Sequence, residues 1–173
     1  LVHAAGNEGK NTEKEENFPN KFFADSTGIT MGTATAWIEV GASSWMDDED
    51  LVADFSNYGK KTVDVFAPGV KINSTYPNSK YKDNSGTSMA SPVVAGLAGL
   101  LRSYYPKLSA MQVKEIILNS VNKVDHKVKV TDKGNSSKVL FSDICVSGGI
   151  VNTYNAVVLA EKMSKTSVKA KVN

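Results

Sequence analysis

Apolar positions along the chain gather in short runs that polar segments separate. Four of these runs have the length and the turn-rich borders of β-strands. They lie at residues 1–5, 37–42, 63–67 and 71–76. Residues 10–20, between the first two runs, are polar and charged and predict a surface loop.

A long apolar segment at residues 88–104 predicts a helix. Apolar or small side chains cover it all round, which is typical of a helix buried at the centre of a domain. Pro92 falls in the first turn, where its missing N–H costs little. Gly96 and Gly99 lower helix propensity, so they predict that another backbone packs closely against them.

A second helix is predicted to begin after Ser109, because Gln112 completes a capping box with it. Its apolar residues recur at helical spacing: Val113, Ile116, Ile117 and Val121. Residues 122–146 predict a polar, irregular segment that contains some strand.

Near the end of the chain, residues 148–151 predict a turn that leads into a last helix at 153–163. The lysine-rich tail from Lys162 is expected to be frayed. Strands that alternate with helices predict an α/β layered domain with a largely parallel sheet. No internal repeat or linker divides the sequence, so residues 1–173 are assigned to one domain.

Composition narrows the class of protein. Hydrophobic residues make up 41% and charged residues 22% of the chain, as in ordinary globular domains. The net charge of +2 argues neither for nor against a polyanionic partner. The lack of a basic tract with interleaved aromatics predicts no nucleic-acid partner. The longest apolar run, residues 93–101, is shorter than the roughly 20 residues of a membrane-spanning helix. Cys145 is the single cysteine, which excludes an internal disulfide and a cysteine-based zinc site.

The string Ser-Gly-Thr-Ser-Met-Ala-Ser-Pro at residues 85–92 stands where a turn enters the long helix. A helix N-terminus supplies a positive partial charge and free N–H groups. The N–H of Ser88 is therefore placed to face a developing oxyanion, and its hydroxyl to act as a nucleophile. The competing interpretation is a helix cap that is merely rich in serine and threonine.

The string His-Ala-Ala-Gly-Asn-Glu-Gly at residues 3–9 places Asn7 in a turn after the first strand. A neutral amide N–H₂ donates to an oxyanion without adding a titrating group. On its own, a Gly-Asn pair indicates only a turn.

The two strings, in this order, resemble the oxyanion-hole and nucleophile motifs of the subtilase family of serine proteases. Three further stretches resemble family segments: residues 55–59, 63–70 and 148–152. The resemblance implies a three-layer α/β fold with a mostly parallel sheet, of which only the C-terminal half is present. The first residue is not Met and falls within a predicted strand, so the chain is expected to be a fragment.

The resemblance also implies roles for particular residues. Ser88 would be the nucleophile, and its N–H would hold the oxyanion together with the amide of Asn7. The residues expected to line the specificity pocket or otherwise bind substrate are Ala4, Ala5, Gly6, Gly86 and Thr87. No metal is expected to take part in the chemistry.

One departure from the family affects activity. Subtilases order their triad Asp, His, Ser, and the strings that carry the Asp and the His are absent here. His3 is expected to be a partly buried structural residue and His126 a surface loop residue. Asp54 and Asp64 are expected to be ordinary family positions. Since a serine without a base is a poor nucleophile, this chain alone is predicted to be inactive.

Three interpretations of function follow. The first is a serine endopeptidase in the parent protein, acting through an acyl-enzyme. The second is a non-catalytic fragment that acts as a binding or self-associating module. The third, an α/β-hydrolase esterase, fails because the Gly-x-Ser-x-Gly elbow would need Gly where Ala90 stands.

The partners implied are a peptide or protein substrate, the missing N-terminal half of the domain, and a second copy paired through an exposed sheet edge. No cofactor is expected for catalysis. Structural calcium is common in the family, but no ligand cluster locates a site, and residues 47–50 are expected to form a solvated acidic loop. The family resemblance implies that the protein is secreted or belongs to the cell envelope.

Overall fold

A five-stranded sheet forms the centre of the computed structural model, which describes residues 1–169, with side chains to residue 165. Its strands lie in the order β1-β4-β5-β11-β8. Their bounds are Val2–Ala4 for β1, Ile38–Ser43 for β4, Val65–Pro68 for β5, Gly149–Ile150 for β11 and Asn122–Lys123 for β8. The first four run parallel and β8 pairs antiparallel, which confirms the predicted mostly parallel sheet.

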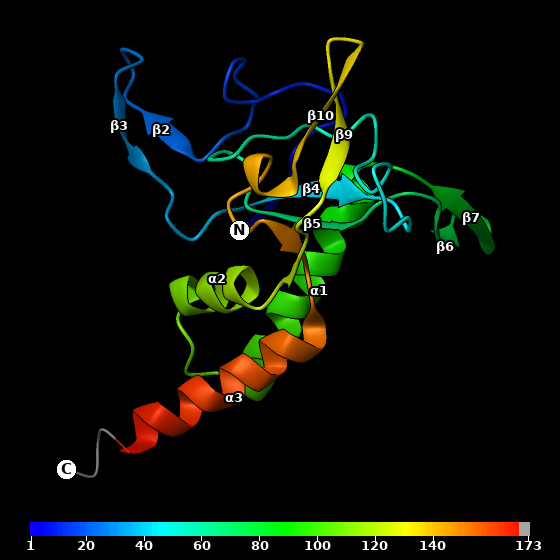
Figure 1. The fold of residues 1–173 in the computed structure, drawn as a ribbon. Coiled ribbons are helices and arrows are strands. Elements are labelled where there is room, and N and C mark those ends of the chain that lie inside the picture. Colours follow the sequence, from blue (N-terminus) through cyan, green and yellow to red (C-terminus); the bar gives the residue numbers. More distant parts are fainter. Residues whose placement is uncertain (170–173) are drawn as a thin grey trace.

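Three two-stranded hairpins extend from this body (Figure 1). They are β2 (Phe22–Ala24) with β3 (Thr30–Thr33), β6 (Ile72–Tyr76) with β7 (Lys80–Asn84), and β9 (Lys127–Asp132) with β10 (Asn135–Leu140). Of these strands, the apolar pattern predicted only β6. The prediction that residues 122–146 are largely irregular is wrong, because Val128 and Val130 of β9 point into the core at strand spacing.

Three helices pack on one face of the sheet, below it in Figure 1. They are α1 (Thr87–Tyr104), α2 (Ala110–Asn119) and α3 (Thr153–Lys169). On the opposite face, a second apolar cluster joins Phe66 of β5 to the β9–β10 hairpin and to the short helix η1 (Phe141–Asp143). The sheet thus lies between a layer of helices and a layer of hairpin and loops.

The start of α2 and the end of α3 can be compared with the sequence predictions. The capping box is confirmed, since Gln112 N–H donates to Ser109 Oγ and Ser109 N–H donates to Gln112 Oε1. The last helix is longer than the predicted 153–163, because α3 continues to Lys169, and the expected fraying from Lys162 stays a prediction. An ion pair between Lys165 and Glu161, one turn apart, supports this extension. Residues 170–173 of the predicted tail lie outside the described part.

One side of α1 has no neighbour among residues 1–169. Ala90, Val94, Leu97 and Leu101 face the sheet and are buried. On the other side Val93 and Leu100 are 38% and 36% exposed. A Cβ added to Gly96 or Gly99 would meet nothing within 4 Å, so the expected close backbone contact is not made by the described residues.

Candidate active site

The first site segment leaves the carboxyl end of β1. Ala5 N–H continues the parallel pairing by donating to Val40 O at 2.9 Å, and the chain then turns sharply at Gly6. Gly6 has φ +99°, a backbone conformation that side chains disfavour, and Asn7 follows it in an exposed position.

The second site segment is the N-terminus of α1. Its N-cap residue Gly86 has φ 155° and ψ 159°, a region that is essentially restricted to glycine. Gly86 N–H donates to Gly69 O, and Gly69 N–H donates to Ser43 O at the end of β4. The first turn of α1 is therefore fixed to the carboxyl edge of the sheet, the same edge at which β1 ends.

Side-chain contacts join these two segments. Thr87 donates twice to Asn7 Oδ1, once from its backbone N–H and once from its hydroxyl, each at 2.9 Å. Because two donors converge on Oδ1, the amide has only one orientation. Asn7 Nδ2, which forms no hydrogen bond within residues 1–169, is the part of the amide left to donate.

The free donors border one small space. A Cβ built on Gly86 would lie 3.5 Å from Asn7 Nδ2 and 3.7 Å from Ser88 N. Ser88 N–H is an orphan donor of the first helical turn, with no acceptor in the described part of the chain. Two N–H groups thus flank a position that only a glycine leaves empty, next to the exposed Ser88.

Thr87 holds this arrangement together from inside. It is buried, and its hydroxyl accepts a hydrogen bond from Gly6 N–H at 3.2 Å while donating to Asn7. These contacts assign Thr87 to the positioning of Asn7. Its predicted contact with substrate stays a prediction, as does that of Gly86.

The other predicted substrate-binding residues lie where β1 ends. Ala4 and Gly6 are half-buried, whereas the Ala5 side chain is completely buried in the second apolar cluster. Ala5 O accepts hydrogen bonds from Asn17 Nδ2 and Asn57 Nδ2, both at 2.8 Å. The Ala5 carbonyl is therefore engaged by the protein, and the pocket assigned to this stretch stays a prediction.

No base reaches Ser88 among the side chains that the structure describes, and its hydroxyl forms no hydrogen bond there. His3 on β1 is half-buried, with Nδ1 2.9 Å from Glu39 Oε1 and its ring centroid 5.0 Å from that of Trp37, the two rings tilted by 40°. His126 is half-buried in the bend before β9, with Nε2 3.1 Å from Asp48 O. Both histidines are placed as the sequence predicted.

Two carboxylates of the acidic loop at residues 47–50 form ion pairs with lysines of the β9–β10 hairpin. In the acidic loop, Glu49 pairs with Lys129 and Lys138, which lowers its pKa to about 2. Asp50 pairs with the same Lys129 at 3.0 Å.

Within residues 1–169, no group of three His, Cys, Asp or Glu side chains is arranged to hold a metal ion. Burial raises the pKa of the Cys145 thiol, which disfavours the reactive thiolate.

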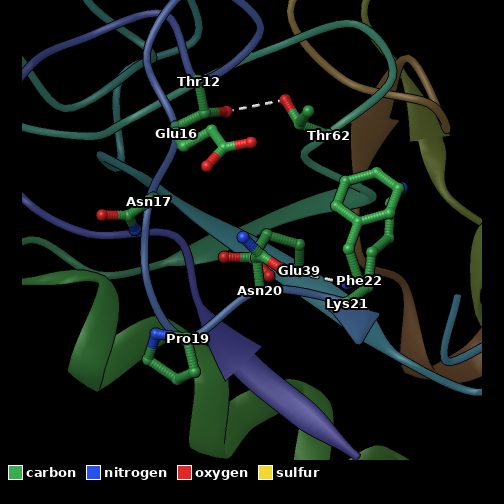
Figure 2. Close-up of a pocket in the computed structure, with 9 residues that line it drawn as sticks. All are labelled: Thr12, Glu16, Asn17, Pro19, Asn20, Lys21, Phe22, Glu39 and Thr62. Carbon is green, nitrogen blue, oxygen red and sulfur yellow. Dashed lines mark hydrogen bonds between the residues drawn. The ribbon is translucent and has the colours of Figure 1, made fainter. Parts of the chain in front are cut away.

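A small cavity of about 50 Å³ lies beside the loop before β2 (Figure 2). Its lining residues are Thr12, Glu16, Asn17, Pro19, Asn20, Lys21, Phe22, Glu39 and Thr62. Thr12 and Thr62 close one side through a 2.6 Å hydrogen bond between their hydroxyls. Neither Ser88 nor Asn7 lines this cavity, so we assign it no part in the site.

Asn57 is the residue at the site whose contribution the sequence did not reveal. It belongs to residues 55–59, which resemble a family segment but carried no predicted role. Its buried side chain contacts the backbone on both sides of Asn7. No local pattern in the sequence indicates this role, because the contacts join segments about 50 residues apart along the chain.

Known proteins resemble this chain in both sequence and fold. Residues 1–142 match the subtilase family. Subtilisin DY from Bacillus licheniformis is 43% identical over 115 residues, which cover 66% of this chain and 36% of that protein. Thermitase from Thermoactinomyces vulgaris is 40% identical over 124 residues, which cover 72% of this chain and 37% of that protein. The chain therefore spans little more than a third of the length of these relatives.

Among solved structures, a chain described under "Structural basis of subtilase cytotoxin SubAB assembly" aligns with a TM-score of 0.70. The alignment covers 98% of this chain and 51% of that one, at 22% identity, and so shows the α/β fold. The match over residues 1–142 and the identity to subtilisin DY and thermitase show that this chain belongs to the subtilase family.

Proposed function

We propose that the protein carrying this chain is a serine endopeptidase with Ser88 as its nucleophile. The observation that carries the proposal is the junction between the two site segments. Asn7 Oδ1 is held by Thr87, which leaves Asn7 Nδ2 and Ser88 N–H beside one empty position at Gly86. Donors fixed in advance around such a position are what a developing oxyanion requires.

In this reaction Ser88 Oγ attacks the carbonyl carbon of the scissile peptide while a base takes the hydroxyl proton. The carbonyl oxygen becomes an oxyanion that accepts from Asn7 Nδ2 and Ser88 N–H. The C–N bond then breaks, the base returns its proton to the leaving amine, and the acyl group remains on Ser88. Water then attacks the ester carbonyl while the base takes one of its protons, and a second oxyanion forms. The bond between the acyl carbon and Ser88 Oγ breaks, the base returns the proton to Oγ, and the acid is released.

The base and its orienting acid are assigned to a part of the protein other than residues 1–169. His3 and His126 are both engaged away from Ser88. The outer edge of β1 and the exposed side of α1 support this assignment, because both lack neighbours in the described chain. We propose that the remaining part of a subtilase domain packs there and brings its histidine to Ser88.

The substrate is proposed to be a peptide or protein that lies along the end of β1, close to Ala4 and Gly6. The chemistry of Ser88 needs no cofactor, and structural calcium is not assigned to any residue. Secretion or attachment to the cell envelope is proposed from family membership. No helix within residues 1–169 combines the length and the apolar character needed to cross a bilayer.

A second candidate function is a non-catalytic module that binds another chain. The open edge of β1 favours it, because unpaired strand edges pair with other strands. The two candidates differ at Ser88: only the endopeptidase needs its hydroxyl.

A fluorophosphonate probe tests the proposed function in the natural full-length protein. The probe bonds covalently to an activated serine, and peptide mapping identifies the modified residue. We expect labelling at Ser88, and none in the 173-residue chain alone. Absence of labelling in the full-length protein, or labelling of a different serine, would contradict the endopeptidase and favour the binding module.

A further inference from the structure

We propose that Asn57 is a positioning residue for the oxyanion site, acting through the loop that carries Asn7. The inference rests on the proposed function, since it concerns how Asn7 is held for the same reaction. Asn57 lies in the connection between β4 and β5 and touches neither Ser88 nor the space at Gly86. Its contacts nevertheless surround Asn7 along the chain.

The Asn57 side chain uses its full hydrogen-bonding capacity on this loop. Nδ2 donates to Ala5 O at 2.8 Å and to Glu8 Oε2 at 2.6 Å. Oδ1 accepts from Glu8 N–H and Lys10 N–H, both at 3.2 Å. An amide has two donors and two acceptor positions, so none is left over.

Backbone hydrogen bonds of the same segment add to the four bonds of the Asn57 side chain, and together we call these bonds the clamp. Asn57 N–H donates to Gly6 O at 3.0 Å, and Tyr58 N–H donates to Lys10 O at 3.1 Å. Residues on both sides of Asn7 are thereby tied to the Asn57 segment. No hydrogen bond joins Asn7 itself to that segment within residues 1–169, and the Asn7 side chain accepts from Thr87 instead.

Asn57 is in turn anchored to the central sheet. The neighbouring Ser56 hydroxyl donates to Asn57 O at 3.0 Å and accepts from Ala42 N–H of β4 at 2.9 Å. Ser56 and Asn57 are both buried, so these bonds are shielded from competing water. A continuous path of hydrogen bonds therefore runs from β4 to the loop that presents Asn7.

Energetic reasoning predicts what loss of the clamp does. Removing the Asn57 amide leaves Ala5 O with only its bond from Asn17, and it leaves Glu8 N–H and Lys10 N–H without partners. Gly6 keeps its conformation only while its flanks are held, and displacement of Gly6 shifts Asn7. A displaced Asn7 amide still permits substrate to bind, but it stabilises the transition state less.

The test is a double-mutant cycle on peptide hydrolysis by the natural full-length protein. It compares Asn57→Ala, Asn7→Ala and the double variant with the wild type. Rates are normalised by active-site titration, so that misfolded molecules do not count. Asn57→Ala is expected to lower kcat by about 10- to 100-fold with KM within about two-fold, because small misplacements of catalytic groups have effects of this size.

In the Asn7→Ala background, Asn57→Ala is expected to lower kcat further by less than about three-fold, since residues that act as a unit are not additive. The matched control is Ser120→Ala, which removes a buried hydroxyl bonded to Ile117 O at 3.3 Å, away from the site. It is expected to leave kcat unchanged. If Asn57→Ala does not fold, Asn57→Ser replaces it in the same cycle, with a smaller expected loss.

The outcomes separate this inference from the proposed function. Multiplicative losses from Asn7→Ala and Asn57→Ala in an active enzyme, or a rise in KM as the main effect of Asn57→Ala, would overturn the positioning role alone. A full-length wild type without peptidase activity would overturn both the positioning role and the endopeptidase.

Discussion

The Asn7 loop and the exposed side of α1 differ in how many contacts they receive from the rest of this chain. Hydrogen bonds from Asn57 hold the loop on both sides of Asn7, and Thr87 fixes the amide itself. Along α1, Val93 and Leu100 are partly exposed and nothing approaches the two glycines. The relative position of Asn7 and Ser88 is therefore set within this chain, whereas the proposed mechanism assigns the activation of Ser88 to contacts from outside the described residues.

The largest effect expected concerns that activation. In the full-length protein, Ser88→Ala should lower turnover on the order of 10⁶-fold, the loss that removal of the nucleophile or base causes in the relative subtilisin. The 173-residue chain alone should be inactive to a similar degree. A chromogenic peptide assay on homogeneous samples measures both. Hydrolysis by the isolated chain at ordinary enzyme rates would show that a base lies within it.

Asn7→Ala should have the next largest effect, because it removes one of two donors at the junction. We expect kcat to fall roughly 10²- to 10³-fold with little change in KM, the range found for loss of an oxyanion donor. Steady-state kinetics of the full-length protein measure this. A rise in KM as the main effect would place Asn7 in ground-state binding.

Gly86→Ala should damage the same junction by a different route. The added Cβ would approach Asn7 Nδ2 and Ser88 N and force a residue into a glycine conformation. Such strain costs about 1–3 kcal/mol, and the oxyanion position is partly filled. We expect a lower Tm together with lower kcat. Unchanged kinetics would mean that the oxyanion forms elsewhere; Gly134→Ala, on a distant hairpin turn with positive φ, is the matched control for strain.

Oxidation of Met89 should reduce the activity of the full-length protein. Met89 follows Ser88, and its Sδ would lie 3.7 Å from a Cβ built on Gly86, so its sulfoxide puts a polar oxygen beside the oxyanion position. Peroxide treatment, peptide mapping and a residual-activity assay test this together. Full activity with Met89 quantitatively oxidised would be inconsistent with this placement.

The smallest effect on stability is expected on the exposed side of α1. Leu100→Lys in the 173-residue chain should change the free energy of unfolding by no more than about 0.5 kcal/mol, as surface substitutions do. The matched control Leu97→Ala, on the buried side, should cost about 2–5 kcal/mol. Denaturant titration at a dilution where the chain is monomeric measures both. Comparable losses there would show that the chain itself covers this side of α1.

Light scattering over a dilution series measures whether the isolated 173-residue chain self-associates. The isolated chain should self-associate or bind an apolar dye, because the β1 edge and the α1 side are both uncovered. Leu100→Lys should reduce this association. A compact monomer at all concentrations, without dye binding, would show that these surfaces need no partner.

The fold was predictable where one local pattern dominated. The apolar runs located β1, β4, β5, β6 and α1. Ser109 with Gln112 located the start of α2, and the turn at residues 148–151 located the start of α3. The β9–β10 hairpin was missed because its few apolar residues, Val128, Val130, Val139 and Leu140, stand among many lysines and serines. The extension of α3 beyond Lys162 was missed because a lysine-rich segment gives no apolar stripe.

Of the site, the sequence identified Ser88 and Asn7 through their motifs but not the contacts that position them. Thr87 reaches Asn7 only because β1 and α1 meet at one edge of the sheet, which no local pattern encodes. Asn57 lies far along the chain from the loop it holds. Hydrogen bonds between residues so far apart along the chain can be identified only from the tertiary structure. Buried polar groups form hydrogen bonds within the protein, but the sequence does not show which polar groups are buried.

Binding of a peptide boronate tests the central claim most directly, because the tetrahedral adduct on Ser88 places an oxygen where the oxyanion forms. The full-length wild type should bind the boronate far more tightly than the matching peptide acid. Asn7→Ala should weaken boronate binding by roughly 10²- to 10³-fold, in parallel with kcat, and leave binding of the acid unchanged. Equal boronate affinity in the wild type and in Asn7→Ala would contradict the account.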